Sequence, residues 1–129
     1  MSQSGQAKKI LIVEDEAQLL DVLRDEFSQA GFEVFKAKDG EEGYAVALEK
    51  RPDLILVDIL MPKMDGLTMF NKMREHEELK KIPGIILTNV NDSGTISKAL
   101  ESGAFDFLVK SDWEPKSLVA RVKEKLAMR

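Results

Sequence analysis

The fold is decided by the stretch Asp53-Leu54-Ile55-Leu56-Val57-Asp58-Ile59-Leu60-Met61-Pro62-Lys63-Met64-Asp65-Gly66. Its short apolar run predicts a buried strand at residues 54–58. The strand ends on a carboxylate, Asp58, and is followed by a proline, a turn signal and a helix-period pattern. A charged group at the tip of an apolar strand is costly to bury unless it has a partner or a function. Asp58 is therefore the first candidate functional residue.

Four other segments share this apolar pattern, and a helix-period pattern follows each strand. Strands are expected at residues 9–13, 32–35, 54–58, 82–88 and 105–110, and helices at 17–30, 40–50, 67–74, 91–102 and 115–128. In the second helix we expect Tyr44, Ala45 and Leu48 to face the core. The alternation predicts right-handed crossovers and a parallel sheet covered on both faces. The expected fold is α/β, a three-layer, doubly wound (βα)5 sandwich with the flavodoxin-like strand order 2-1-3-4-5.

Composition narrows the function classes. A hydrophobic fraction of 43% with 33% charged residues fits one globular domain. The net charge of -4 argues against a nucleic-acid surface built on bulk positive charge. The absence of cysteine excludes a disulfide, a thiol nucleophile and a thiolate metal site. No apolar run approaches a membrane span, and the N-terminus lacks the apolar core of a signal peptide. We expect a cytoplasmic protein without membrane insertion or direct nucleic-acid binding, with a flexible tail at residues 1–8 and one domain at 9–129.

Polar residues stand at the carboxyl ends of four expected strands. They are Glu14 and Asp15 after the first, Asp58 on the third, Thr88 on the fourth and Lys110 on the fifth. Ligands of doubly wound sheets bind beyond these ends. In the order 2-1-3-4-5 the first and third strands are neighbours, and so are the third and fourth. The polar set is therefore expected to converge around Asp58.

Three carboxylates at one place repel one another. At ~4 Å and an effective dielectric constant of ~20, each pair costs roughly 4 kcal/mol before screening. Either one carboxyl is protonated or a cation lies among them, and oxygen ligands without His or Cys suit Mg²⁺. An aspartate that attacks phosphorus forms an acyl phosphate, and Lys110 and Thr88 can bind phosphoryl oxygens. These residues favour Asp58 as a phosphoryl acceptor.

The same residues, in this order, resemble the receiver domains of bacterial two-component response regulators over about residues 8–127. The resemblance includes the chemotaxis-Y-like stand-alone receivers. It rests on these motifs: Glu14-Asp15, Ala37-x-x-Gly40, Asp58-Ile-Leu-Met-Pro62-x-Met-Asp-Gly66, Thr88 and Gly103-Ala104-x-Asp-Phe107-Leu-x-Lys110. Each motif is weak alone, and together at strand ends they are highly specific.

The resemblance implies phosphoryl transfer to Asp58 from the phosphohistidine of a histidine kinase or a histidine phosphotransfer protein. It implies Mg²⁺ bound by Glu14, Asp15, Asp58 and the backbone carbonyl of Leu60. It also implies a phosphorelay switch that is not an enzyme toward a released substrate. Such a protein catalyses only its own phosphotransfer and its slow self-dephosphorylation.

A conformational change is implied as well. Thr88 and Phe107 would move as switch residues when Asp58 is modified. The surface of the fourth helix, the fifth strand and the fifth helix would then change its preference for an unidentified output protein. A monomer or weak dimer is expected, either as a stand-alone receiver or as a piece of a larger regulator.

The chain departs from the usual family pattern at two positions, Ser111 and Asn89. Lys110 is followed by Ser111, where the family usually has proline after a cis peptide; a cis bond before a non-proline residue costs ~3 kcal/mol. Asn89 follows Thr88, where a small residue is usual. Leu60 and Val90 are apolar and offer no group to orient an attacking water, so slow hydrolysis of the phosphorylated form is expected.

Three other functions compete with the switch as interpretations of this sequence. A haloacid-dehalogenase-like phosphatase carries a second Asp two residues after the nucleophile, where this chain has Leu60. A flavin-binding electron carrier needs a phosphate cradle after the first strand, where this chain has Glu14, Asp15 and Glu16. A receiver-like module that binds partners without phosphorylation is kept open by Asn89 and Ser111. The sole histidine, His76, is expected on the polar side of the third helix and away from the chemistry.

Overall fold

The structure, a computed structural model, describes residues 7–58, 66–88, 106–109 and 114–127. Five strands form one parallel sheet: β1 (Lys9–Val13), β2 (Glu33–Ala37), β3 (Leu54–Asp58), β4 (Gly84–Thr88) and β5 (Asp106–Val109). Their spatial order is β2-β1-β3-β4-β5, which confirms the predicted order. Strands β1 and β3 are therefore neighbours although about forty residues separate them in the sequence.

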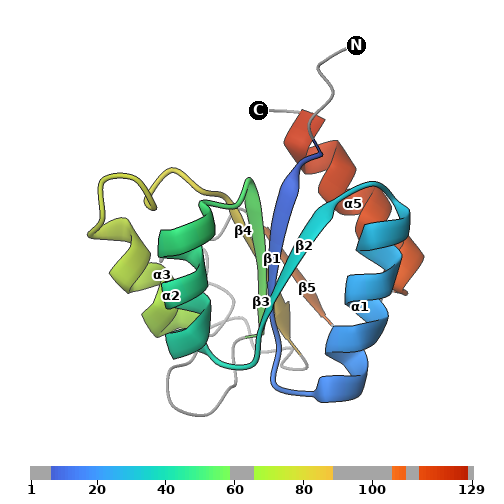
Figure 1. Ribbon diagram of the computed structural model, residues 1–129, viewed down its shortest axis with the longest axis horizontal. Coiled ribbons are helices and arrows are strands. Elements are labelled where there is room, and N and C mark those ends of the chain that lie inside the picture. The colour runs from blue at the N-terminus through green and yellow to red at the C-terminus, as the bar shows by residue number, and fades with distance from the viewer. Residues whose placement is uncertain (1–6, 59–65, 89–105, 110–113, 128–129) are drawn as a thin grey trace.

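Helices cover both faces of this sheet (Figure 1). α1 (Ala17–Gln29) and α5 (Pro115–Ala127) lie on one face, and α2 (Gly40–Lys50) and α3 (Gly66–Arg74) lie on the other. The three-layer architecture is thus confirmed, while the helix expected at residues 91–102 lies outside the described residues. None of the described helices combines the length and the apolar character needed to cross a bilayer.

Alternating side chains of the strands build two cores. Along β1, Ile10 and Ile12 pack into the layer with α1 and α5, whereas Leu11 and Val13 pack into the layer with α2 and α3. All four are fully buried. Burial on both faces explains why the strands read as continuous apolar runs instead of alternating apolar and polar residues.

The inner face of α2 differs from the prediction. Ala45 is exposed and Tyr44 and Leu48 are half-buried, while the buried positions of the helix are Gly40, Gly43 and Ala47. The reason is close packing: a Cβ on Gly43 would lie 2.9 Å from a methyl group of Val13 and from Met69 Sδ. Small residues therefore let α2 approach the sheet, and the larger side chains lie beside the contact.

His76 also lies elsewhere than predicted. α3 ends at Arg74, so His76 belongs to the turn that follows and not to the polar side of the helix. Its backbone N–H donates to the Met73 carbonyl at 3.0 Å, and its Nδ1 accepts from the Glu78 N–H at 3.3 Å. His76 therefore helps to hold the turn before β4, through its backbone N–H and through its imidazole.

Candidate functional site

Strand register brings the ends of β1 and β3 to one level. Val13 pairs with Val57, so the residues that follow them, Glu14 and Asp58, stand side by side at the carboxyl edge of the sheet. All five residues of β3 are buried, and Asp58, the last of them, is 7% exposed. A buried strand thus carries a carboxylate to the edge where ligands of this architecture bind.

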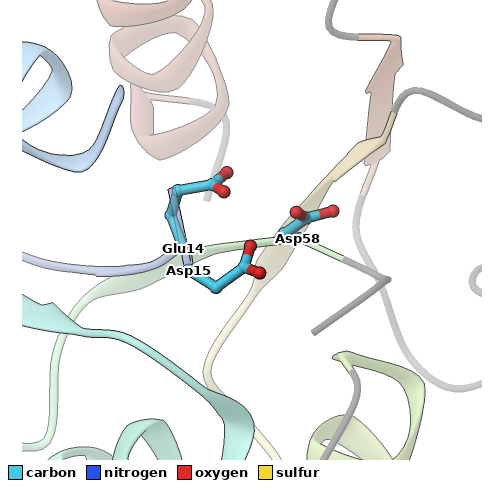
Figure 2. A group of neighbouring side chains, drawn as sticks. All are labelled: Glu14, Asp15 and Asp58. Atoms are coloured by element: carbon cyan, nitrogen blue, oxygen red, sulfur yellow. The ribbon is translucent and has the colours of Figure 1, made fainter. Parts of the chain in front are cut away.

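Three carboxylates meet at this edge. One carboxylate oxygen from each of Glu14, Asp15 and Asp58 lies within 4.8 Å of the other two. Figure 2 shows Glu14 and Asp15 on the segment that leaves β1 and Asp58 at the end of β3, with the carboxylates of Asp15 and Asp58 turned toward one another. The convergence predicted for these three residues is confirmed.

The members of this acidic cluster (Glu14, Asp15 and Asp58) have different environments. Glu14 is fully buried, its Oε2 accepts from the Glu16 N–H at 3.1 Å, and Asp15 is exposed. Glu16 is the N-cap residue of α1, yet its side chain makes no capping hydrogen bond. Glu14, rather than Glu16, therefore supports the turn that leads into α1, while Asp15 keeps the cluster open to solvent.

Electrostatics explains what this arrangement can bind. At ~4.8 Å and an effective dielectric constant of ~20, each pair of ionised carboxylates costs about 3–4 kcal/mol before screening. A divalent cation among the oxygens offsets this repulsion. The donor set consists of oxygen atoms alone, with one exposed member that leaves room for water ligands, and this is the chemistry that fits Mg²⁺.

For the candidate residues Thr88 and Phe107, strand pairing gives the position of the backbone. Asp58 pairs with Leu87, so Thr88, the last residue of β4, stands one position beyond Asp58 on the neighbouring strand. Phe107 lies in β5 and pairs with Ile86. Thr88 pairs with Val109, the residue before Lys110. The fourth and fifth strands therefore end at the same edge as the acidic cluster.

Several residues singled out in the sequence lie outside the described residues. They are Leu60, Asn89, Val90, Lys110 and Ser111. The proposed carbonyl ligand, the proposed phosphoryl-binding lysine and the peptide after it are among them. Their roles remain predictions from the sequence.

Comparison with known proteins gives one consistent result. The family profile of the response regulator receiver domain matches residues 10–123. The transcriptional regulatory protein SrrA of Staphylococcus aureus (strain NCTC 8325 / PS 47) is 37% identical over 117 residues, which are 91% of this chain and 47% of that protein. The chain therefore spans about half the length of this curated relative.

Solved structures agree with the sequence match. A putative response regulator from Chloroflexus aurantiacus is 36% identical with a TM-score of 0.86, covering 94% of this chain and 98% of that one. The CheX-CheY-BeF3-Mg+2 complex from Borrelia burgdorferi contains a chain that is 28% identical, with a TM-score of 0.85 and coverage of 94% and 90%. Both similarities extend over nearly the whole chain.

Proposed function

The chain belongs to the response regulator receiver domain family, and from this membership we propose that it is a switch phosphorylated on Asp58. Receiver domains are signalling switches and not enzymes in the ordinary sense, and their relatives work with histidine kinases and output domains. Family membership leaves open which residue accepts the phosphoryl group. The identification of Asp58 as this acceptor is the core of the proposal.

One observation carries it. A buried strand holds Asp58 at the carboxyl edge of the sheet, with carboxylate oxygens of Glu14 and Asp15 within 4.8 Å. If Asp58 served only as a helix cap or as a solvated strand end, no such convergence of like charges would be needed. The cluster also disfavours the flavin-carrier alternative, because it would repel a ligand phosphate.

In the proposed reaction a carboxylate oxygen of Asp58 attacks the phosphorus of a phosphohistidine. The new O–P bond forms an acyl phosphate, the P–N bond breaks, and the electron pair leaves on the imidazole nitrogen of the donor. The position of the Asp58 carboxylate at the strand tip, beside the exposed Asp15, supports this role. Phosphoryl transfer requires mainly positioning, to which the strand ends contribute, and charge neutralisation, which we assign to Mg²⁺ and Lys110.

We assign the metal and phosphoryl-binding roles as follows. Glu14, Asp15, Asp58 and the Leu60 carbonyl would hold Mg²⁺, which would neutralise the charge on the incoming phosphoryl oxygens. Lys110 and the Thr88 hydroxyl bind the other phosphoryl oxygens. The cluster geometry and the Mg²⁺ in the Borrelia burgdorferi complex support the metal part of this assignment.

Signal output follows from the position of the neighbouring strands. We propose that Thr88 and Phe107 respond to phosphorylation and change the surface around β5 and α5, which an output protein reads. The donor is a histidine kinase or a histidine phosphotransfer protein. We place the domain at residues 9–129 after a tail at 1–8, as a cytoplasmic monomer or weak dimer.

Small acyl phosphates test the proposal without a kinase. The wild-type chain, incubated with acetyl phosphate and Mg²⁺, is expected to gain the mass of one phosphoryl group, and Asp58→Asn is expected to gain none. Addition of EDTA should abolish the gain by the wild type. Equal modification of both proteins would show that Asp58 is not the acceptor.

A further inference from the structure

The turn between β2 and α2 holds the backbone of Glu14 from outside the acidic cluster. The last pair of the β1–β2 ladder is Val13 with Ala37. One residue later, the Glu14 N–H donates to the Ala37 carbonyl oxygen at 3.0 Å. On this side of β1, the direction of the Ala37 carbonyl therefore sets where Glu14 lies.

The peptide group that carries this carbonyl is hydrogen-bonded at both ends. Its N–H, which belongs to Lys38, donates to Oε1 of Glu42 at 2.8 Å. Because a peptide group is planar, a bond that fixes its N–H also fixes the direction of its carbonyl. A carboxylate acceptor polarises the peptide as well, which strengthens the bond that the carbonyl oxygen accepts from Glu14.

The beginning of α2 places the Glu42 side chain for this contact. Asp39 is the N-cap residue and is 4% exposed, and its Oδ1 accepts from the Glu42 N–H at 2.8 Å. Glu42 reaches back from the third position of the helix to the backbone before the cap. The pair resembles a capping box, in which the cap and the third residue bind each other's backbone, except that Glu42 binds the N–H of Lys38, one residue before the cap.

We infer that Glu42 is a positioning residue for the metal site. It orients the peptide between Ala37 and Lys38, and this peptide holds Glu14 where its carboxylate meets those of Asp15 and Asp58. The inference rests on the proposed function, because it takes the acidic cluster to bind Mg²⁺. Glu42 itself touches neither the metal nor the phosphoryl group.

Three variants that each remove one negative charge separate this role from bulk electrostatics. Glu42→Ala loses the bond to the Lys38 N–H. Glu42→Gln keeps an oxygen acceptor at the same place. Glu41→Ala removes the charge of the neighbouring exposed residue, for which the structure gives no hydrogen bond to this peptide. Mg²⁺ affinity is measured by calorimetric titration, and hydrogen exchange is followed at the backbone amide of Glu14.

Glu42→Ala is expected to weaken Mg²⁺ binding by about threefold or more relative to Glu41→Ala, as losses of residues that support metal ligands do. Exchange of the Glu14 amide should accelerate, while that of Leu11 in the middle of β1 stays unchanged. Glu42→Gln should match Glu41→Ala in both measurements. A role confined to capping α2 would lower the melting temperature and leave Mg²⁺ affinity and Glu14 exchange equal to those of Glu41→Ala.

Two outcomes would count against the inference, and they can be told apart. If the wild type binds Mg²⁺ and all three variants bind it equally, Glu42 has no positioning role and the proposed function stands. If the wild type binds no Mg²⁺, the proposed metal site fails and the inference fails with it.

Discussion

At the scale of single residues, Glu14 and Asp15 are neighbours in the sequence but differ in their exposure to solvent. Glu14 is fully buried and hydrogen-bonded through Oε2 to the turn before α1, whereas Asp15 is exposed. The exposed carboxylate has the greater freedom to orient toward a bound cation, and it faces Asp58 directly (Figure 2). Asp15 is therefore the residue whose charge should matter most for metal affinity relative to its effect on folding.

Asp15→Asn is expected to weaken Mg²⁺ binding by about tenfold or more, because one of three anionic ligands loses its charge. Glu16→Gln is the matched control, since Glu16 is exposed, adjacent and outside the acidic cluster. Titration calorimetry measures both affinities. An Asp15→Asn protein that binds Mg²⁺ as the wild type does would contradict the assigned site.

Glu14→Gln is expected to stabilise the metal-free protein by about 1–2 kcal/mol, because it removes a buried charge from a cluster of like charges. The amide oxygen of Gln can still accept the bond from the Glu16 N–H. Urea unfolding in EDTA measures the change, and Glu41→Gln on the exposed face of α2 controls for net charge. A less stable Glu14→Gln protein would show that repulsion within the cluster does not govern its stability.

At the scale of helices and strands, two glycines allow α2 and α3 to pack close to the sheet. Gly43 brings α2 against Val13 and Met69, and Gly84 at the start of β4 lies against the ring of Phe70 from α3. A Cβ at either position meets its neighbour closer than normal packing allows. These two glycines therefore define how near the layer of α2 and α3 lies to the strands that carry the site.

Gly84→Ala is expected to destabilise the fold by about 2–3 kcal/mol, because its new methyl group would overlap the Phe70 ring. Phe70→Leu makes room beside it, so the double variant should lose less than the sum of the two single losses, by about 1 kcal/mol or more. Denaturant unfolding of all four proteins closes the cycle. Strictly additive losses would mean that the two side chains do not oppose each other.

The sequence predicts the type and order of each described element. The reason is that the signals are local: apolar runs for strands, helical spacing, and Gly or Pro at the ends. It also predicts the acidic cluster, because Asp15 follows one recognisable strand, Asp58 ends another, and parallel strands end at one edge. Both predictions need only the pattern along the chain and the strand order.

Details that depend on distant partners are not predictable in this way. β2 extends to Ala37, beyond the expected end at residue 35, because it pairs with β1 as far as Val13. Gly43 and Ala47 replace Ala45 on the inner face of α2 because the sheet lies too close for larger side chains. The contact of Glu42 with the Lys38 backbone gave no sequence signal beyond the spacing of Asp39 and Glu42.

At the scale of the whole molecule, the residues proposed for the chemistry gather at one edge of the sheet. The acidic cluster, Thr88 and the end of β5 lie at this edge, and β5 is bonded to β4 along its length. A change at Asp58 can therefore reach β5 through a single intervening strand. This short path is the physical basis of the proposed switch, in which phosphorylation would alter a surface elsewhere on the domain.

The lifetime of the phosphorylated state is a property of this switch. Leu60 and Val90 are apolar in the sequence and have no group that could orient an attacking water, so a lifetime of many minutes is expected. Leu60→Gln should shorten it and Leu60→Met should not. Loss of radiolabel from the purified phosphoprotein measures it, and a wild-type lifetime of seconds would contradict the expectation.

Chemical mapping of the phosphorylated residue tests the central claim most directly. Borohydride reduces an aspartyl phosphate to homoserine, so protein phosphorylated with acetyl phosphate and Mg²⁺ can be reduced, digested and sequenced by mass spectrometry. We predict homoserine at position 58 alone, and none when Mg²⁺ is withheld. Homoserine at Asp15, or a phosphoryl group retained on another residue such as His76 with Asp58 intact, would contradict the account.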